Sequence, residues 1–190
     1  MCITFFVLNP PSGAQSNVEF LIAFNRDEQS ERKTLPFGAF EEDPNIYAGR
    51  DLISGGTWLG INIKTGVIAF LTNFDQNNPR AGKSRGKMIK NFLKTSFLEK
   101  AESAAEVEEC IIKEMKTILS DPMTYSAFNL AVYHITSSQM FYICTETGMN
   151  EPLKLKEGIN YGLCNGALDD IWPKTEHGLH LFRAVIESMA

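Results

Sequence analysis

Short apolar runs bounded by polar or turn residues occupy much of the first half of the chain. Residues 2–8 (CITFFVL) have apolar side chains at odd and even positions, which predicts a central strand that is buried on both faces. Residues 19–25 form a second run, short enough to pair with the first as an antiparallel hairpin. Residues 58–63 and 67–73 flank Lys64-Thr65-Gly66, which predicts a second hairpin.

The second half of the chain changes to helical periodicity and then back to strands. Apolar residues at helical spacing predict helices over residues 85–98, 104–119 and 174–188. Strand-like runs cover residues 127–135 and 140–145, and a shorter one begins at Tyr161. Strands, helices, strands and a last helix, in that order, predict an α+β fold with two sheets.

Composition narrows the class of protein. The chain has 190 residues, 44% hydrophobic and 22% charged, which predicts one globular domain over residues 1–190. Its net charge of −5 argues against a general binder of nucleic acid or anionic membranes, but it allows a local basic patch. The first apolar run is too short for a signal peptide or a transmembrane segment, so we expect an intracellular protein. Four cysteines without C-x-x-C spacing predict free thiols and no metal site.

Cys2 is the first candidate for chemistry. An initiator methionine is usually removed before a small residue, which would leave a thiol and a free α-amino group on Cys2. An amine of pKa about 8 can take the thiol proton and later return it to a leaving group. The alternative is that Cys2 is simply a small apolar residue in a core strand.

Residues 25–28 (NRDE) follow the second strand directly. If the first two strands are antiparallel, Cys2 lies beside Arg26 or Asp27. A guanidinium group lowers the pKa of a nearby thiol, and a carboxylate can orient the α-amino group. Asn73, at the end of another buried strand, is a candidate donor to an oxyanion. The alternative is that NRDE is a solvated loop.

One basic cluster, residues 78–87, stands out in this acidic chain. Arg80, Lys83 and Arg85 precede or open a predicted helix, where backbone N–H groups also favour an anion. A phosphate-binding loop of the nucleotide-hydrolysing type is excluded, because Asn77 occupies the position of the first glycine. The cluster therefore predicts either an anion site or a solvated helix start.

Several motifs taken together resemble one known family. They are Met1-Cys2, Asn25-Arg26-Asp27-Glu28, Gly55-Gly56-Thr57-Trp58-Leu59-Gly60, Leu71-Thr72-Asn73, Ser84-Arg85-Gly86, Phe128-Asn129-Leu130 and Gly162-Leu163-Cys164-Asn165. In this order they resemble the Transport and Golgi Organization protein 2 family, also called NRDE proteins. That family resembles N-terminal-nucleophile hydrolases, with two stacked antiparallel sheets between helix layers (αββα). Typical members continue beyond Ala190, so by this resemblance the sheets could lack their last strands.

The resemblance also implies a set of site residues. Cys2 would be the nucleophile, Asn73 and Asn165 would stabilise an oxyanion, and Arg26 or Asp27 would lie beside the amino group. The ligand-binding residues that we predict are Asn25, Glu28, Trp58, Arg80, Lys83 and Arg85.

Two functions of different classes follow from these residues. The family is implicated in haem trafficking, in lipid and acyl-coenzyme A homeostasis, and in Golgi and mitochondrial function. This resemblance implies a cytoplasmic protein, associated with mitochondria or the Golgi, that passes haem or acyl-CoA to acceptor proteins and requires no cofactor of its own. Trp58, Phe70 and the aromatic first strand would then line an apolar pocket. The alternative is an enzyme, an amidase or thioesterase that works through a Cys2 acyl intermediate. A third possibility is a scaffold whose pocket stays empty.

Overall fold

Two antiparallel sheets form the centre of the fold. The structure, a computed structural model, describes residues 2–10, 18–75, 83–94, 98, 100–121 and 124–189. The smaller sheet has three strands, in the order β10 (Tyr161–Leu163), β1 (Cys2–Leu8) and β2 (Phe20–Arg26). The larger has seven strands, in the order β3 (Thr34–Phe40), β4 (Asp43–Asp51), β5 (Leu59–Asn62), β6 (Val67–Asn73), β7 (Phe128–His134), β8 (Gln139–Cys144) and β9 (Leu153–Lys154).

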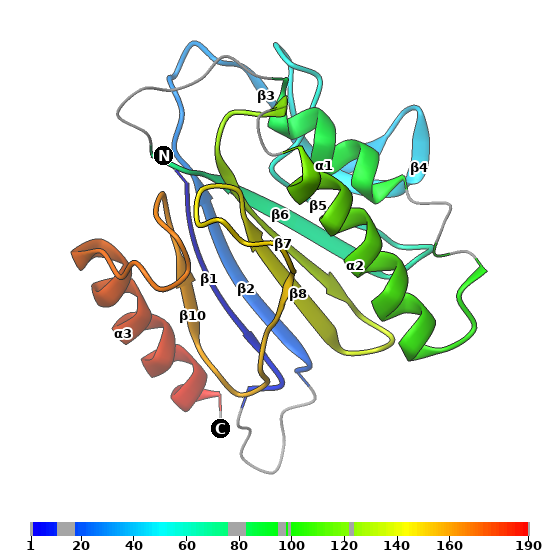
Figure 1. The fold of residues 1–190 in the computed structure, drawn as a ribbon. Helices are drawn as coiled ribbons and strands as arrows, with labels where there is room; N and C mark the ends of the chain where they lie inside the picture. Colours follow the sequence, from blue (N-terminus) through cyan, green and yellow to red (C-terminus); the bar gives the residue numbers. More distant parts are fainter. Residues whose placement is uncertain are drawn as a thin grey trace.

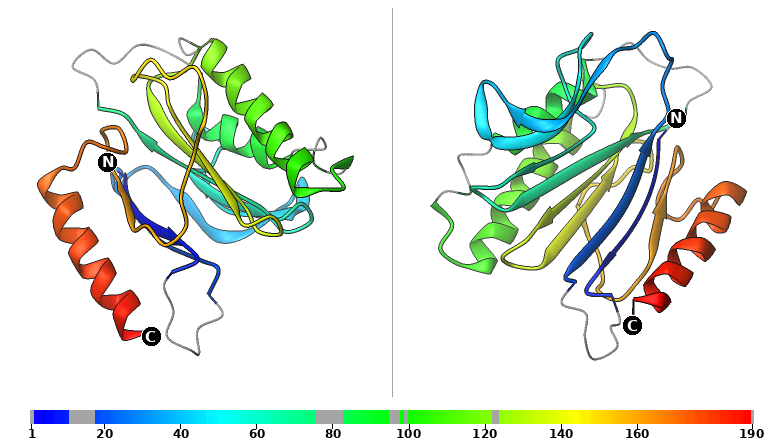
Figure 2. Two further views of the ribbon diagram at one scale, coloured as in Figure 1. Left: turned by 60° about the horizontal axis from the view of Figure 1, so that its bottom comes forward. Right: turned by 180° about the vertical axis from the view of Figure 1, so that it is seen from behind.

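Helices cover the outer faces of both sheets, so the layers follow the order helix, sheet, sheet, helix (Figures 1 and 2). Helices α1 (Arg85–Leu93) and α2 (Ala104–Ser120) pack on the seven-stranded sheet, and α3 (Pro173–Ser188) packs on β1 and β10. This arrangement confirms the predicted α+β class and its αββα layers. None of the helices that the described residues form is long and apolar enough to cross a membrane.

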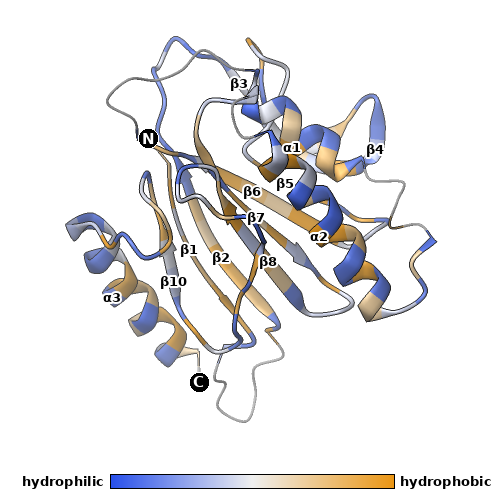
Figure 3. Cartoon of the chain, viewed as in Figure 1, coloured by the Kyte–Doolittle hydropathy of each residue, from blue (hydrophilic) through white to orange (hydrophobic). Residues whose placement is uncertain are grey.

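Apolar residues concentrate in the central strands, such as β1 and β6 (Figure 3). Strand alternation distributes their side chains over three apolar layers, one between the sheets and one between each sheet and its helices. Phe6 and Leu8 of β1 pack between the sheets against Phe70 of β6, and all three are buried. On the opposite face of β1, Val7 packs against Phe182 of α3. Because β1 has apolar contacts on both faces and strands on both sides, the prediction of a central buried strand is confirmed.

The predictions failed where the apolar pattern is weak. Neither β3 nor β4 was predicted, because β3 consists mainly of exposed residues and β4 begins at Asp43-Pro44-Asn45. The predicted helix over residues 85–98 was too long, since α1 ends at Leu93 and residues 95–97 lie outside the described ranges. Its apolar spacing continues to Phe97, but periodicity alone does not mark where a helix ends.

Candidate functional site

The register of the first hairpin brings two predicted site residues together. Cys2 on β1 is the direct cross-strand partner of Arg26 on β2, so their side chains share one face of the small sheet. Both line a cavity of about 390 Å³ at the end of the sandwich. The prediction that Cys2 lies beside Arg26 is therefore confirmed.

Charged and polar groups dominate the wall of this cavity, which we call the Cys2 cavity. Its lining residues are Cys2, Arg26, Asp27, Glu28, Arg32, Asp51, Ser54, Gly56, Thr57, Trp58, Leu71, Asn73, Lys83, Ser84, Arg85, Gly86 and Ser126. The predicted apolar pocket is wrong in this respect, because Phe6 and Phe70 are fully buried between the sheets and only Trp58 of the predicted aromatic set reaches the cavity. Phe6 shares the face of Cys2 but lies four residues further along β1, between the sheets, and Phe70 points into the same layer.

Burial governs the Cys2 thiol. The residue is only 7% exposed, and this burial raises the pKa of the thiol above its ordinary value. The backbone N–H of Asp27 and the charge of Arg26 act in the opposite direction and lower the pKa, but by less. Cys2 is therefore mainly a neutral thiol near pH 7, and it needs a base or a bound ligand to become a strong nucleophile.

Ion pairs and a ring contact fix the guanidinium of Arg26. Its Nη2 donates to Oδ2 of Asp51 at 2.8 Å and to Glu28 at 3.3 Å, and its guanidinium carbon lies 4.3 Å from the ring centroid of Trp58. Arg32 Nε donates to the same Asp51 oxygen at 2.6 Å. Two arginines thus share one buried carboxylate, which neutralises much of their charge.

Asp51 also builds the turn that closes one side of the cavity. Its Oδ1 accepts hydrogen bonds from the N–H groups of Ile53, at 3.0 Å, and Ser54, at 2.8 Å. Burial alone would raise the pKa of Asp51, but the hydrogen bonds from Arg32 and these N–H groups outweigh it and lower the pKa to about 2. Asp51 is therefore ionised at neutral pH and joins Arg26 to the turn.

A contact between two glycines sets α1 against this turn. A Cβ atom at Gly56 would lie 2.3 Å from the carbonyl carbon of Gly86, so only glycine allows this approach. The N–H of Thr57 donates to the Gly86 carbonyl at 3.1 Å. Gly55 takes the positive φ of the turn, at 68°, and Gly56 lines the cavity.

Two further cations, Lys83 and Arg85, line the cavity at the start of α1. Within the described residues, no carboxylate lies in ion-pair distance of either side chain. Arg85 Nη1 instead donates to the carbonyl of Ala127 at 3.1 Å. Burial lowers the pKa of Arg85, yet an arginine remains charged near pH 7. This part of the cavity wall therefore carries positive charge that no carboxylate of the described chain offsets.

Asn73 and Asn165 have different places in the site. Asn73 lines the cavity, whereas Asn165 lies behind it and its Nδ2 donates to the Asn73 carbonyl at 2.7 Å. The Cys164 thiol donates to Asn165 Oδ1 at 3.1 Å and to the Cys2 carbonyl at 3.3 Å. Cys164 and Asn165 together therefore connect the segment after β10 to the ends of β1 and β6. The role of Asn165 as an oxyanion donor remains a prediction.

Buried polar side chains hold the segment after β10 in place. Asn129 Nδ2 donates to the Gly166 carbonyl at 2.9 Å, and the hydroxyl of Tyr142 donates to Asn129 Oδ1 at 2.6 Å. The same hydroxyl accepts a hydrogen bond from the N–H of Leu168 at 3.0 Å. Burial raises the pKa of Tyr142 far above its ordinary value, so the phenol stays neutral and can donate.

Comparison with known proteins matches the whole chain to one family. The family model described as Transport and Golgi organisation 2 covers residues 1–190. This chain belongs to that family. "Transport and Golgi organization protein 2 homolog" of Bos taurus is 30% identical over 193 residues, covering 98% of this chain and 65% of the cattle protein. "Transport and Golgi organization protein 2" of Drosophila melanogaster is 29% identical over 198 residues, covering 99% of this chain and 66% of its own length. The chain thus spans somewhat less than two thirds of these relatives.

In this Transport and Golgi organisation 2 chain, most of the predicted ligand residues lie on the cavity wall. Glu28, Trp58, Lys83 and Arg85 line it, while Arg80 lies outside the described residues. Asn25 pairs with Ile3 and faces away from Arg26, and it is not among the lining residues, so its ligand role stays a prediction.

Sequence reasoning missed Arg32 and Asp51, the two partners that complete the Arg26 network. Asp51 had a usable signal, since an acidic residue directly before Leu-Ile-Ser-Gly-Gly is typical of a turn that its side chain caps. Arg32 had none, because it lies in a polar stretch with no periodicity. Among the described residues, no group of three or more His, Cys, Asp or Glu side chains could hold a metal ion.

Proposed function

We propose that the Cys2 cavity binds the polar, anionic end of an acyl compound such as acyl-CoA, and that the protein handles this ligand inside the cell. Lys83 and Arg85, at the start of α1, carry the proposal, because no carboxylate of the described residues pairs with them. Together with the positive end of the helix dipole, they favour phosphate or carboxylate. The proposal includes a cytoplasmic location with association to mitochondria or the Golgi, in keeping with relatives named for transport and Golgi organisation.

The distribution of charge favours an anion over a neutral ligand. Arg26 and Arg32 already share the Asp51 carboxylate, so an incoming anion would gain little from them. Arg85 has lost water through burial, and the partner that the described residues give its side chain is the backbone carbonyl of Ala127. An anion would supply the charge-assisted hydrogen bonds that this guanidinium lacks.

Haem is the less well supported cargo. A flat apolar macrocycle needs an apolar slot, but the large apolar side chains among the described lining residues are only Trp58 and Leu71. The described lining contains no histidine, so Cys2 is the residue there that could hold the iron. Roles in haem homeostasis thus rest on the family resemblance, and the cavity favours the acyl ligand.

A second candidate function is hydrolysis of an amide or thioester at Cys2, favoured by the Asp27 N–H next to the sulfur. The sulfur would attack the carbonyl carbon to form a C–S bond, while the substrate's C–N or C–S bond breaks. The proton from Cys2 would pass to the leaving amine or thiol. Water would then cleave the acyl intermediate, release the acid and return a proton to the thiol. Asn73 would donate to the oxyanion.

Calorimetric titration with acyl-CoA tests the binding proposal. The variant Lys83→Glu/Arg85→Gln should bind at least about tenfold more weakly, because it loses charge-assisted hydrogen bonds. Its affinity should also depend less on salt.

The glutamine amide of this variant keeps a donor for the Ala127 carbonyl, which protects the fold. Lys113→Glu/Lys156→Gln makes a matched charge change at exposed lysines outside the cavity lining and should bind normally. Equal affinity of both variants and the unmodified protein would contradict the proposal.

Cys2→Ala separates the two functions. Ligand transfer to an acceptor protein should survive this substitution, because Lys83 and Arg85 are unchanged. If the unmodified protein rapidly cleaves a thioester or amide and Cys2→Ala abolishes that turnover, Cys2 is a nucleophile. That result would contradict the ligand-handling proposal and support the hydrolase.

A further inference from the structure

Two aliphatic side chains project from the turn that borders the Cys2 cavity. Leu52 is 49% exposed and Ile53 is 69% exposed. The two are neighbours in the chain, so they form one exposed apolar patch on this turn. The turn is also well fixed: Gly55 N–H donates to the Asp51 carbonyl at 2.8 Å, and Asp51 N–H to the Gly56 carbonyl at 2.9 Å. The fold therefore holds these side chains outward.

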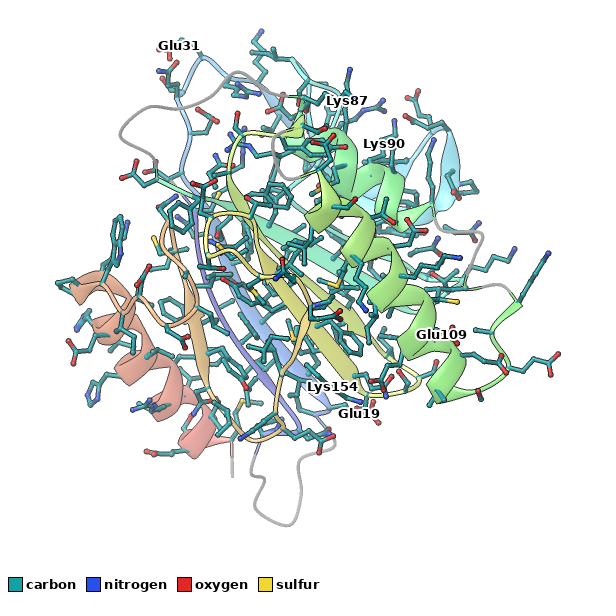
Figure 4. The ribbon with its side chains drawn as sticks, in the orientation of Figure 1. Glu19, Glu31, Lys87, Lys90, Glu109 and Lys154 are labelled. Carbon is teal, nitrogen blue, oxygen red and sulfur yellow. The ribbon has the colours of Figure 1, made fainter. Side chains whose placement is uncertain are left out.

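Cations surround the same turn. Leu52 and Ile53 line a groove of about 450 Å³ together with Arg50, Lys87, Lys90 and Lys94. We call these six residues the α1 groove surface. The three lysines recur at intervals of three and four residues, so they form one stripe along α1, and Figure 4 shows Lys87 and Lys90 projecting from it.

Acidic residues offset only part of this charge. Glu42 forms ion pairs with Arg50, at 2.9 Å, and with Lys90. Lys87 and Lys94 have no carboxylate within ion-pair distance among the described residues. The surface as a whole is thus positive, although the chain is acidic.

We propose that the α1 groove surface docks on an anionic lipid bilayer. Leu52 and Ile53 enter the boundary between headgroups and acyl chains, and the lysine stripe contacts the lipid phosphates and carboxylates. Exposed aliphatic residues favour a bilayer over a soluble anion, because a soluble anion offers them no apolar surface. Ser54 lines both the groove and the Cys2 cavity, so docking would bring the cavity to the membrane.

Sedimentation with lipid vesicles tests this proposal independently of any chemistry at Cys2. The protein should bind phosphatidylcholine vesicles that contain about 30 mol% phosphatidylserine far better than pure phosphatidylcholine vesicles, and about 0.5 M salt should release much of it. Leu52→Ser/Ile53→Ser and Lys87→Glu/Lys94→Glu should each lower the partition coefficient at least about tenfold. All four side chains are outside the core, so thermal unfolding should change little.

Two control variants test whether the loss of binding is specific to the α1 groove surface. Leu181→Ser/Val185→Ser removes two aliphatic side chains of α3 that are each 53% exposed, and it should bind vesicles normally. Lys113→Glu/Lys156→Glu should also bind normally. Equal binding to both kinds of vesicle, or binding that neither groove variant weakens, would overturn the proposal. If only the lysine variant weakens binding and soluble glycerophosphoserine competes with the vesicles, the groove is a site for a soluble anion, and membrane docking is wrong.

Discussion

The two halves of β1 face very different surroundings, although one short apolar sequence forms both. Phe6 and Leu8 are sealed between the sheets, where their neighbours are aromatic and aliphatic side chains. Cys2, on the same face of the strand, opens on a cavity with four cations and three carboxylates. The apolar half fixes where the strand lies, and so it places the thiol. The chemistry around that thiol comes from segments far away in the sequence.

The comparison predicts that the packed half carries the stability of the fold. Phe70→Ala should lower the free energy of unfolding by about 3–5 kcal/mol, because it leaves a void between the sheets against Phe6. Urea unfolding measures this loss. Phe37→Ala, at a ring that is 59% exposed on β3, should cost less than about 1 kcal/mol. Equal losses for the two variants would mean that the inter-sheet layer is not the main core.

At the cavity, backbone contact matters more than side-chain packing. Gly56→Ala should destabilise by about 3 kcal/mol, near the upper end of overpacking costs, because the new methyl group would meet the backbone of Gly86. It should also weaken ligand binding by displacing the start of α1. Gly38→Ala is the matched control, since a Cβ atom there would meet nothing within 4 Å. A Gly56→Ala protein as stable as Gly38→Ala would contradict the close approach of the turn and the helix.

Two carboxylates with the same low pKa should differ in what they contribute. Asp51 and Glu42 both have a pKa of about 2. Burial would raise the pKa of Asp51, but hydrogen bonds from Arg32 and from backbone N–H groups outweigh it. The pKa of Glu42 is low mainly because of its hydrogen bond from Lys90. Asp51 is buried and Glu42 is exposed. Because its pKa is lower folded than unfolded, Asp51 stabilises fully above about pH 4, and this stabilisation is lost as the pH falls through about 2.

Asp51→Asn should therefore cost about 2 kcal/mol at pH 7 and flatten the acid limb of stability between about pH 4 and 2. Glu42→Gln should have little effect, because solvent screens an exposed pair. Urea midpoints across this pH range measure both variants. If the stability of the Asp51→Asn protein falls between about pH 4 and 2 as steeply as that of the unmodified protein, Asp51 is not the cause of that fall.

The predictable part of the molecule followed from its apolar residues. The continuous apolar runs in residues 2–8 and 67–73 predicted β1 and β6, and the hairpin predicted from the first run placed Cys2 beside Arg26. The sequence left Lys83 and Arg85 as either an anion site or a solvated helix start, and nothing in it said that they share a cavity with Cys2. That juxtaposition depends on the Gly56–Gly86 contact, which only the tertiary structure reveals.

The same reasoning failed where exposed or polar residues form strands. The β3–β4 hairpin carries Asp51 at its end, but Pro36, Gly38 and Pro44 interrupt any alternation. Sheet pairing gives such a segment its strand conformation, and propensity does not. The apolar pocket was predicted wrongly for a related reason: an aromatic residue near a site, such as Phe70, can face either layer, and the alternation of β6 directs it to the core.

Alkylation of Cys2 by anionic and neutral reagents tests the positive cavity most directly. Iodoacetate and iodoacetamide differ mainly in charge, and peptide mass spectrometry reports each cysteine separately. The ratio of the iodoacetate rate to the iodoacetamide rate should be several-fold higher at Cys2 than at the partly exposed Cys110, because Lys83 and Arg85 attract the anion. Lys83→Glu/Arg85→Gln should bring the two ratios together. A Cys2 ratio at or below that of Cys110, unchanged in this variant, would contradict an anion-binding cavity.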